Sequence, residues 1–95
     1  MAAIQTLTFD EFVALLRQRL FDAEAIDNST LPDFKELMSD YAEVIPDGWY
    51  DQAYEELEAN GHLNPKLSGG TFGGGPFGRL SADGRLYVRD ERGES

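Results

Sequence analysis

Adjacent carboxylates are the most frequent residues in this sequence that could do acid–base chemistry. Examples are the pairs Asp10 with Glu11 and Glu55 with Glu56. General acid–base catalysis needs a carboxyl group whose pKa is shifted by burial or by a close like charge. Adjacent side chains on a helix diverge and stay solvated, and the sequence holds no nucleophile–base motif. We therefore predict that the protein is not an enzyme.

His62 is the only histidine, and the chain has no cysteine. Transition-metal sites combine several nitrogen or sulfur ligands, and no HExxH motif is present. The acids between residues 22 and 27 lack the spacing and the glycine of an EF-hand calcium loop. The sequence thus predicts no metal site and a neutral His62 in a strand or turn.

Residues 69–78 hold six of the ten glycines, and residues 73–78 fit the pattern GxGxxG. A dinucleotide site of that kind needs a strand before the glycines and a helix N-terminus after them. Here a hairpin strand is expected to follow, and Pro76 removes an amide that could bind phosphate. The Gly-Lys-Ser/Thr ending of a Walker motif is also missing. We predict a mobile loop and no cofactor.

The length of 95 residues suits one domain, residues 1–95, with a single core. Without cysteines the chain has no disulfide framework. It has no signal-peptide pattern and no apolar run near the roughly 20 residues that span a bilayer. Hydrophobic residues at 41% argue against global disorder. We expect a soluble, cytoplasmic, acidic protein with no membrane association and an undetermined oligomeric state.

The formal net charge of −10 is unevenly distributed. Residues 1–60 carry fourteen acids and three bases (net −11), whereas residues 61–95 carry four acids and five bases (net +1). A strongly negative field repels nucleic acid and attracts basic protein surfaces. The charge therefore favours a protein partner with a basic surface and makes nucleic acid an unfavourable one.

A capping box predicts where the first helix begins. Thr8 and Glu11 have its spacing. Apolar residues then recur at steps of three and four, which predicts a helix over residues 9–21, extending at most to Ala25. The apolar residues of this face are Phe9, Phe12, Val13, Leu16 and Leu20.

Two further helices are bounded by prolines and a glycine. Pro32 suits the first turn of a helix and Pro46 ends it, which predicts a helix over residues 31–45 starting from a cap at Ser29 or Thr30. The third helix covers residues 48–60, is capped by Asp47 and ends at Gly61 in the left-handed conformation. The side chains expected to face inward are Phe34, Leu37, Met38, Tyr41 and Ile45 on the second helix and Tyr50, Ala53, Tyr54 and Leu57 on the third.

After a short strand at residues 62–64, the segment 79–89 alternates between apolar and polar residues. Leu80, Leu86 and Val88 are expected on one face of a β-hairpin, with Asp83 and Gly84 in its turn. Residues 91–95 are expected to fray. The predicted fold class is α+β, a three-helix bundle with a C-terminal antiparallel β-hairpin.

The segments YEELEANGHLN (residues 54–64) and GRLSADGRLYV (residues 78–88) carry a resemblance. The order of elements resembles the winged-helix variant of the helix-turn-helix fold, and is loosely similar to the winged-helix domain of bacterial RNA polymerase delta subunits, which is also acidic. The resemblance covers residues 8–90. It implies a third helix used for recognition, which in DNA-binding members is basic. Here that helix contains no lysine or arginine.

Two sets of residues are candidate binding sites. The third helix places Asp51, Glu55 and Glu58 outward at steps of three and four, with Trp49 near their amino end. An aromatic residue beside charges suits recognition of a protein surface, although Trp49 and Tyr50 also suit the core. The second set is a basic strip on the predicted hairpin. It could contact phosphates or pair with the acidic helices. Its residues are Arg79, Arg85, Tyr87 and Arg89.

Four functions are compatible with these patterns. The first is a non-catalytic, winged-helix-like module that binds a basic protein through its acidic helical face. The second is a DNA-binding regulator that uses the arginine-rich hairpin, and the third is an acidic mimic of DNA. The fourth is a salt-adapted protein whose charge serves solubility and has no charge-directed partner.

Overall fold

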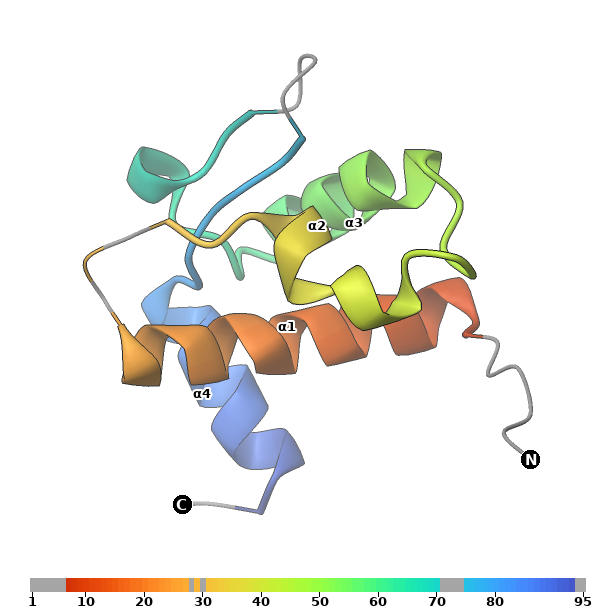
Figure 1. Cartoon of the computed structure of the whole chain (residues 1–95). Helices are drawn as coiled ribbons and strands as arrows, with labels where there is room; N and C mark the ends of the chain where they lie inside the picture. The colour runs from red at the N-terminus through yellow and green to blue at the C-terminus, as the bar shows by residue number, and fades with distance from the viewer. Residues whose placement is uncertain (1–6, 28, 30, 71–74, 94–95) are drawn as a thin grey trace.

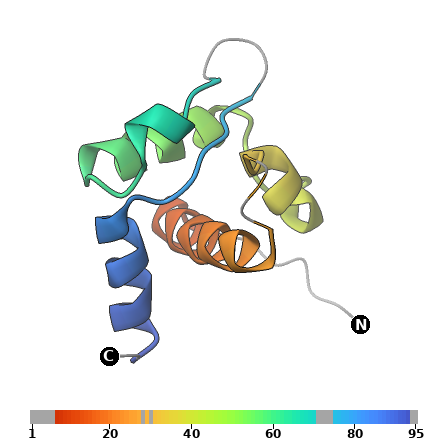
Figure 2. The same ribbon diagram turned by 90° about the vertical axis from the view of Figure 1, so that its left-hand side faces the viewer.

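The computed structural model describes residues 7–27, 29, 31–70 and 75–93. Over these residues the chain forms α-helices α1 (Phe9–Ile26), α2 (Phe34–Leu37), α3 (Gly48–Ala59) and α4 (Ala82–Glu91), with 3-10 turns η1 (Ser39–Tyr41) and η2 (Pro65–Leu67). Helix α1 runs through the middle of the molecule, and α2, α3 and α4 all contact it (Figure 1). Seen from the side, α4 and α2 lie on opposite flanks of α1 (Figure 2).

The capping box at the start of α1 is confirmed. The Thr8 hydroxyl accepts from the Glu11 amide at 3.1 Å, and a Glu11 carboxylate oxygen accepts from the Thr8 amide at 2.9 Å. The helix continues to Ile26, beyond the predicted end, and its apolar face is the centre of the core. The core side chains of α1 are Phe12, Val13, Leu16 and Leu20.

The predicted helix over residues 31–45 is instead a short α2 followed by η1. Asp33, rather than Ser29 or Thr30, caps α2 by accepting from the amides of the next turn. The helix stops at Met38, whose backbone leaves the helical region (φ −110°, ψ 22°), and Arg19 of α1 donates to the Leu37 carbonyl at 2.6 Å. In a continuing α-helix that carbonyl would accept from Tyr41, whose amide binds the Met38 carbonyl instead. Of the predicted inward residues, Phe34, Met38 and Ile45 are buried. Leu37 and Tyr41 are only partly buried and pack against the core.

Helix α3 agrees with the predicted bounds to one residue and buries all four predicted side chains. Asp47 stands at its start but makes no capping hydrogen bond. At its end Gly61 has φ = +73°. The Gly61 amide donates to Glu58 and the His62 amide to Leu57, which is the Schellman arrangement expected of a C′ glycine.

The predicted hairpin at residues 79–89 is wrong, and with it the α+β fold class. No strand forms in the described residues, and α4 occupies this segment. Ser81 caps α4 by accepting from the Gly84 amide at 3.1 Å. Gly84 is in the first turn because the helix presses against the preceding loop: a Cβ built there would lie 2.5 Å from the His62 carbonyl oxygen. The Asp83–Gly84 pair predicts a hairpin turn, but in the structure its glycine allows a close contact between α4 and the preceding loop.

Isolated β-bridges join parts of the loop between α3 and α4 to one another and to the residue before α2. Leu63 pairs with Leu80, and Gly69 and Phe77 exchange two hydrogen bonds of 3.0 Å. Phe77 also pairs with Asp33 in front of α2. The predicted strand at 62–64 is reduced to the Leu63 bridge, and the two ends of the glycine-rich loop are held together. Residues 71–74 of the predicted loop and 94–95 of the predicted tail lie outside the described residues.

We expect Gly84→Ala to lower the free energy of unfolding by about 1–3 kcal/mol, because the new methyl group overlaps a backbone carbonyl. Gly48→Ala is the matched control: Gly48 is also helical, and the nearest heavy atom to its added Cβ is a flexible side-chain atom at 3.7 Å. The control should be neutral or stabilising by up to about 1 kcal/mol. Urea unfolding measures both. Equal stabilities of the two variants would contradict the close contact of α4 with His62.

Candidate functional site

The structure separates Trp49 from the carboxylates with which the sequence groups it. Trp49 is half-buried, and its ring lies 5.5 Å from that of Phe9 and 5.8 Å from that of Phe12, both on α1. Asp51 is two residues further along α3 and so points about 200° away around the helix. Trp49 is therefore part of the packing between α1 and α3, and the predicted combination of an aromatic anchor with charges does not form.

Asp51, Glu55 and Glu58 lie together on the exposed side of α3, as predicted. We call these three residues the α3 ridge. None of them makes an ion pair with a described residue, and none has a basic neighbour on its own helix, because no lysine or arginine occurs between Lys35 and Lys66. The ridge is thus a negative surface that the described part of the chain does not neutralise.

Several acids outside α3 are paired with arginines, in contrast to the ridge, whereas the other exposed acids of α1 and α2 have no ion pair with a described residue. Arg85 and Arg92, on α4 and at its end, lie 3.3 Å and 3.0 Å from Glu24 and Asp22 of α1. Arg19 forms two hydrogen bonds of 2.5 and 2.9 Å with Asp40, and this contact holds the pKa of Asp40 below its usual range. Arg17 is 3.7 Å from Glu91. These pairs tie α1 to its neighbours on both flanks.

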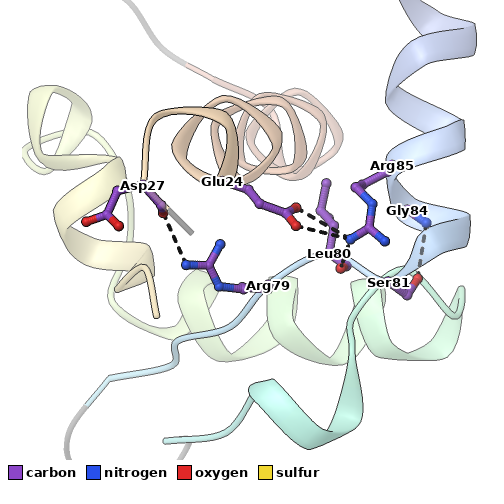
Figure 3. Close-up of polar contacts among 7 residues, drawn as sticks. All are labelled: Glu24, Asp27, Arg79, Leu80, Ser81, Gly84 and Arg85. Carbon is purple, nitrogen blue, oxygen red and sulfur yellow. Dashed lines mark hydrogen bonds and ion pairs between the residues drawn. The ribbon is translucent and has the colours of Figure 1, made fainter. Parts of the chain in front are cut away.

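The four residues predicted to form a basic strip do not share one surface. Arg79 is buried in the extended segment before α4 and donates to the Asp27 carbonyl at 3.1 Å (Figure 3). Arg85 bonds the Leu80 carbonyl as well as Glu24 (Figure 3). Arg89 is exposed beside Phe21. The ring of Tyr87 lies 4.4 Å from the guanidinium of Arg17 and contacts the ring of His62 at a tilt of 44°. Arg79 and Arg85 thus serve the junction of α1 with α4.

His62 is 9% exposed and lies against the ring of Tyr87, at 4.7 Å between centroids. Burial lowers the pKa of its imidazole, and the charge of Arg17 lowers it further, while Asp83 and Glu91 act in the opposite direction. Its Nδ1 has no hydrogen-bond partner among the described residues. No group of three or more potential metal ligands occurs in the described part of the chain. The environment of His62 therefore favours a neutral ring that packs.

A hollow beside the start of α3 was not predicted. It has a volume of about 270 Å³ and lies between the start of α3, Lys35 of α2 and the end of the glycine-rich loop. We call it the α3 pocket. The sequence signal for it is weak: Asp47 and Asp51 are four residues apart on one side of α3, but nothing local shows that Lys35 or the loop joins them. The lining residues are Lys35, Asp47, Gly48, Tyr50, Asp51, Gly75 and Pro76.

Comparison with known proteins identifies no family. No family model matches the chain, and no curated protein or solved structure matches it. Among the described helices, none has the length and apolar character required to cross a membrane.

The lowered pKa of His62 makes a prediction about pH. Because the folded pKa lies below the unfolded value of about 6.5, the unfolded chain binds the proton more readily. The contribution of the neutral ring to stability is complete above about pH 6.5 and is lost as the pH falls through the folded pKa. Thermal unfolding at about pH 7.5 and about pH 5 should show a larger drop in Tm for the wild type than for His62→Gln. Equal drops would contradict burial of a neutral His62.

Proposed function

We propose that the protein is a non-catalytic interaction module that binds a basic protein surface through α3. The observation that carries the proposal is the contrast between acids that are paired within the fold and acids that are not. Asp22, Glu24, Asp40 and Glu91 each have an arginine partner. The three carboxylates of the α3 ridge are exposed, share one side of one helix and have no such partner among the described residues. A cytoplasmic location, expected from the sequence, stays part of this proposal.

A surface of this kind suits recognition of a basic protein for electrostatic reasons. Like charges at steps of three and four repel one another, and a partner that brings cations relieves this repulsion. A negative field also accelerates encounter with a positive surface and orients it. The buried side of α3 holds the ridge on a rigid element, because its four inward residues belong to the core.

The winged-helix resemblance remains part of the proposal without the hairpin. It is supported by the order α1, α2, α3, by the bridges of Phe77 with Asp33 and Gly69, and by the bridge of Leu63 with Leu80. In that arrangement α3 is the recognition helix. An acidic recognition helix is directed at protein rather than at DNA.

The test is charge reversal of the ridge with a charge-matched control. The triple variant Asp51→Lys, Glu55→Lys, Glu58→Lys changes the net charge by six units, from −10 to −4. The control, Glu43→Lys, Asp83→Lys, Asp90→Lys, makes the same change at exposed positions away from α3, and Asp83 matches Asp51 in lying in the first turn of its helix. Each immobilised variant is exposed to native lysate, and bound proteins are identified by mass spectrometry.

We expect the wild type and the control to retain the same basic proteins and the ridge variant to lose them. Both variants should stay folded, because surface substitutions typically change stability by about 0.5 kcal/mol and a first-turn lysine costs about 0.3–1 kcal/mol. Retention of the same partners by the ridge variant would contradict the proposal. Loss of binding in the control as well would show that net charge, rather than α3, determines binding.

The alternative functions make different predictions. A DNA-binding regulator would need Arg85, which is occupied by Glu24 and by a backbone carbonyl. We therefore expect duplex DNA to bind no more tightly than the non-specific range, roughly 10⁻⁴ to 10⁻⁶ M at physiological salt. Sub-micromolar binding in a fluorescence anisotropy titration would overturn this expectation.

The other two alternatives give different results. A DNA mimic would capture DNA-binding proteins and release them when duplex DNA is added. A salt-adapted protein would gain stability steeply with salt.

A further inference from the structure

The α3 pocket combines hydrogen-bond acceptors, a buried phenol and one resident cation. Tyr50 is 4% exposed, and its ring packs edge-on against Phe12 at 5.6 Å, so the ring is part of the core. Its hydroxyl makes no hydrogen bond with a described residue. Burial raises the pKa of Tyr50, and the charges of Asp47 and Asp33 raise it further. Tyr50 lines the pocket together with Asp47.

Asp47 is the second unusual group of the pocket. An aspartate at the start of a helix ordinarily accepts a hydrogen bond from an amide of the first turn, and Asp33 does so at α2. Asp47 does not, because its own backbone is already helical (φ −55°, ψ −39°) and its side chain makes no capping bond. Its carboxylate lines the pocket together with Asp51. Helix capping therefore does not account for Asp47.

Lys35 shows what kind of group the pocket accommodates. Its ammonium nitrogen lies 5.7 Å from the centroid of the Tyr50 ring, and its aliphatic stem passes close to Gly75, where an added Cβ would be 3.6 Å from the Lys35 Cδ. Lys35 nevertheless makes no ion pair with a described acid. A cation thus sits over the phenol ring while both α3 aspartates still have free acceptor oxygens.

We propose that the α3 pocket receives an arginine side chain of the basic partner, with its guanidinium against Asp47, Asp51 and the Tyr50 hydroxyl. Arginine fits because it offers five donors in a planar fork and no acceptor, and the pocket presents two carboxylates four residues apart and a phenol oxygen. It can also stack on an aromatic face. This inference rests on the proposed function, since Asp51 belongs to both the pocket and the α3 ridge.

The test is an NMR titration of the isotope-labelled full chain with N-acetyl-arginine amide, a single arginine without terminal charges. The amide signals of Gly48, Asp51 and Gly75 should shift saturably. N-acetyl-citrulline amide, which has nearly the same shape and no charge, should leave them unchanged, and N-acetyl-lysine amide should bind more weakly than arginine. Equal shifts with citrulline, equal affinity for lysine, or shifts that do not saturate would each overturn the proposal.

Variants of the pocket test the assigned contacts. Asp47→Asn should weaken arginine binding about tenfold, the size of a lost charge-assisted hydrogen bond, and Tyr50→Phe should weaken it while keeping the ring in the core. Lys35→Gln should strengthen binding by about threefold to tenfold, because it removes the resident cation. Glu43→Gln is the control of equal charge to Asp47→Asn and should have no effect.

The outcomes separate this inference from the function on which it rests. If the ridge variant loses its basic partners while Asp47→Asn and Tyr50→Phe leave the arginine titration unchanged, the pocket assignment is wrong and the interaction module stands. If arginine binds as described while the ridge variant keeps all its partners, the pocket stands and the α3 ridge is not the partner-binding surface. Failure of Lys35→Gln to strengthen binding would contradict the place assigned to the guanidinium.

Discussion

Burial of the apolar face of α1 is the interaction on which the rest of the structure depends. Phe12, Leu16 and Leu20 of this helix are at most 1% exposed, and α2, α3 and α4 all pack on it. Few residues are available to bury surface in a chain of this size, so one helix that contacts every other is an efficient centre. Its capping box fixes where the helix begins, and the same register then directs Arg17 and Arg19 toward opposite neighbours, α4 and the α2 region.

The electrostatics of the surface follow from this central position. Arg17 and Arg19 on α1 pair with acids of other segments. Arg85 and Arg92, on α4 and at its end, pair with acids of α1. Among the described residues, Arg17, Arg19, Arg85 and Arg92 are used in ion pairs in this way. These contacts close the α1–α4 and α1–α2 junctions, and Lys35, which lies over the Tyr50 ring, makes no ion pair with the acids of α3. The four acids of α3 are therefore among those of the first sixty residues that no described arginine or lysine neutralises.

Periodicity predicted α1 and α3 because their apolar residues and caps agree locally with the tertiary structure. The second predicted helix was wrong because the chain leaves the helical region at Met38, next to the Leu37 carbonyl that Arg19, eighteen residues earlier in the chain, binds. Residues 79–89 were misassigned because Asp83–Gly84 fits both a hairpin turn and the first turn of a helix. The contact of Gly84 with His62 decides between them, and a local pattern does not contain that contact. The predicted site failed in part for a similar reason, since the partners of Trp49 and of Arg79 come from α1 and its end.

The free charge on α3 has a consequence for the coupling of folding and binding. Asp47, Asp51, Glu55 and Glu58 follow one another at steps of three and four, and each like-charged neighbour pair destabilises a helix by about 0.2–0.5 kcal/mol. The core side of α3, with Tyr50, Ala53, Tyr54 and Leu57 buried, offsets this repulsion. A bound cationic surface would remove the repulsion from the folded helix, whereas the unfolded chain cannot hold the carboxylates at this spacing. Any ligand that binds only the folded state increases its stability, so a cationic partner of the kind proposed would stabilise α3 by relieving the repulsion within it.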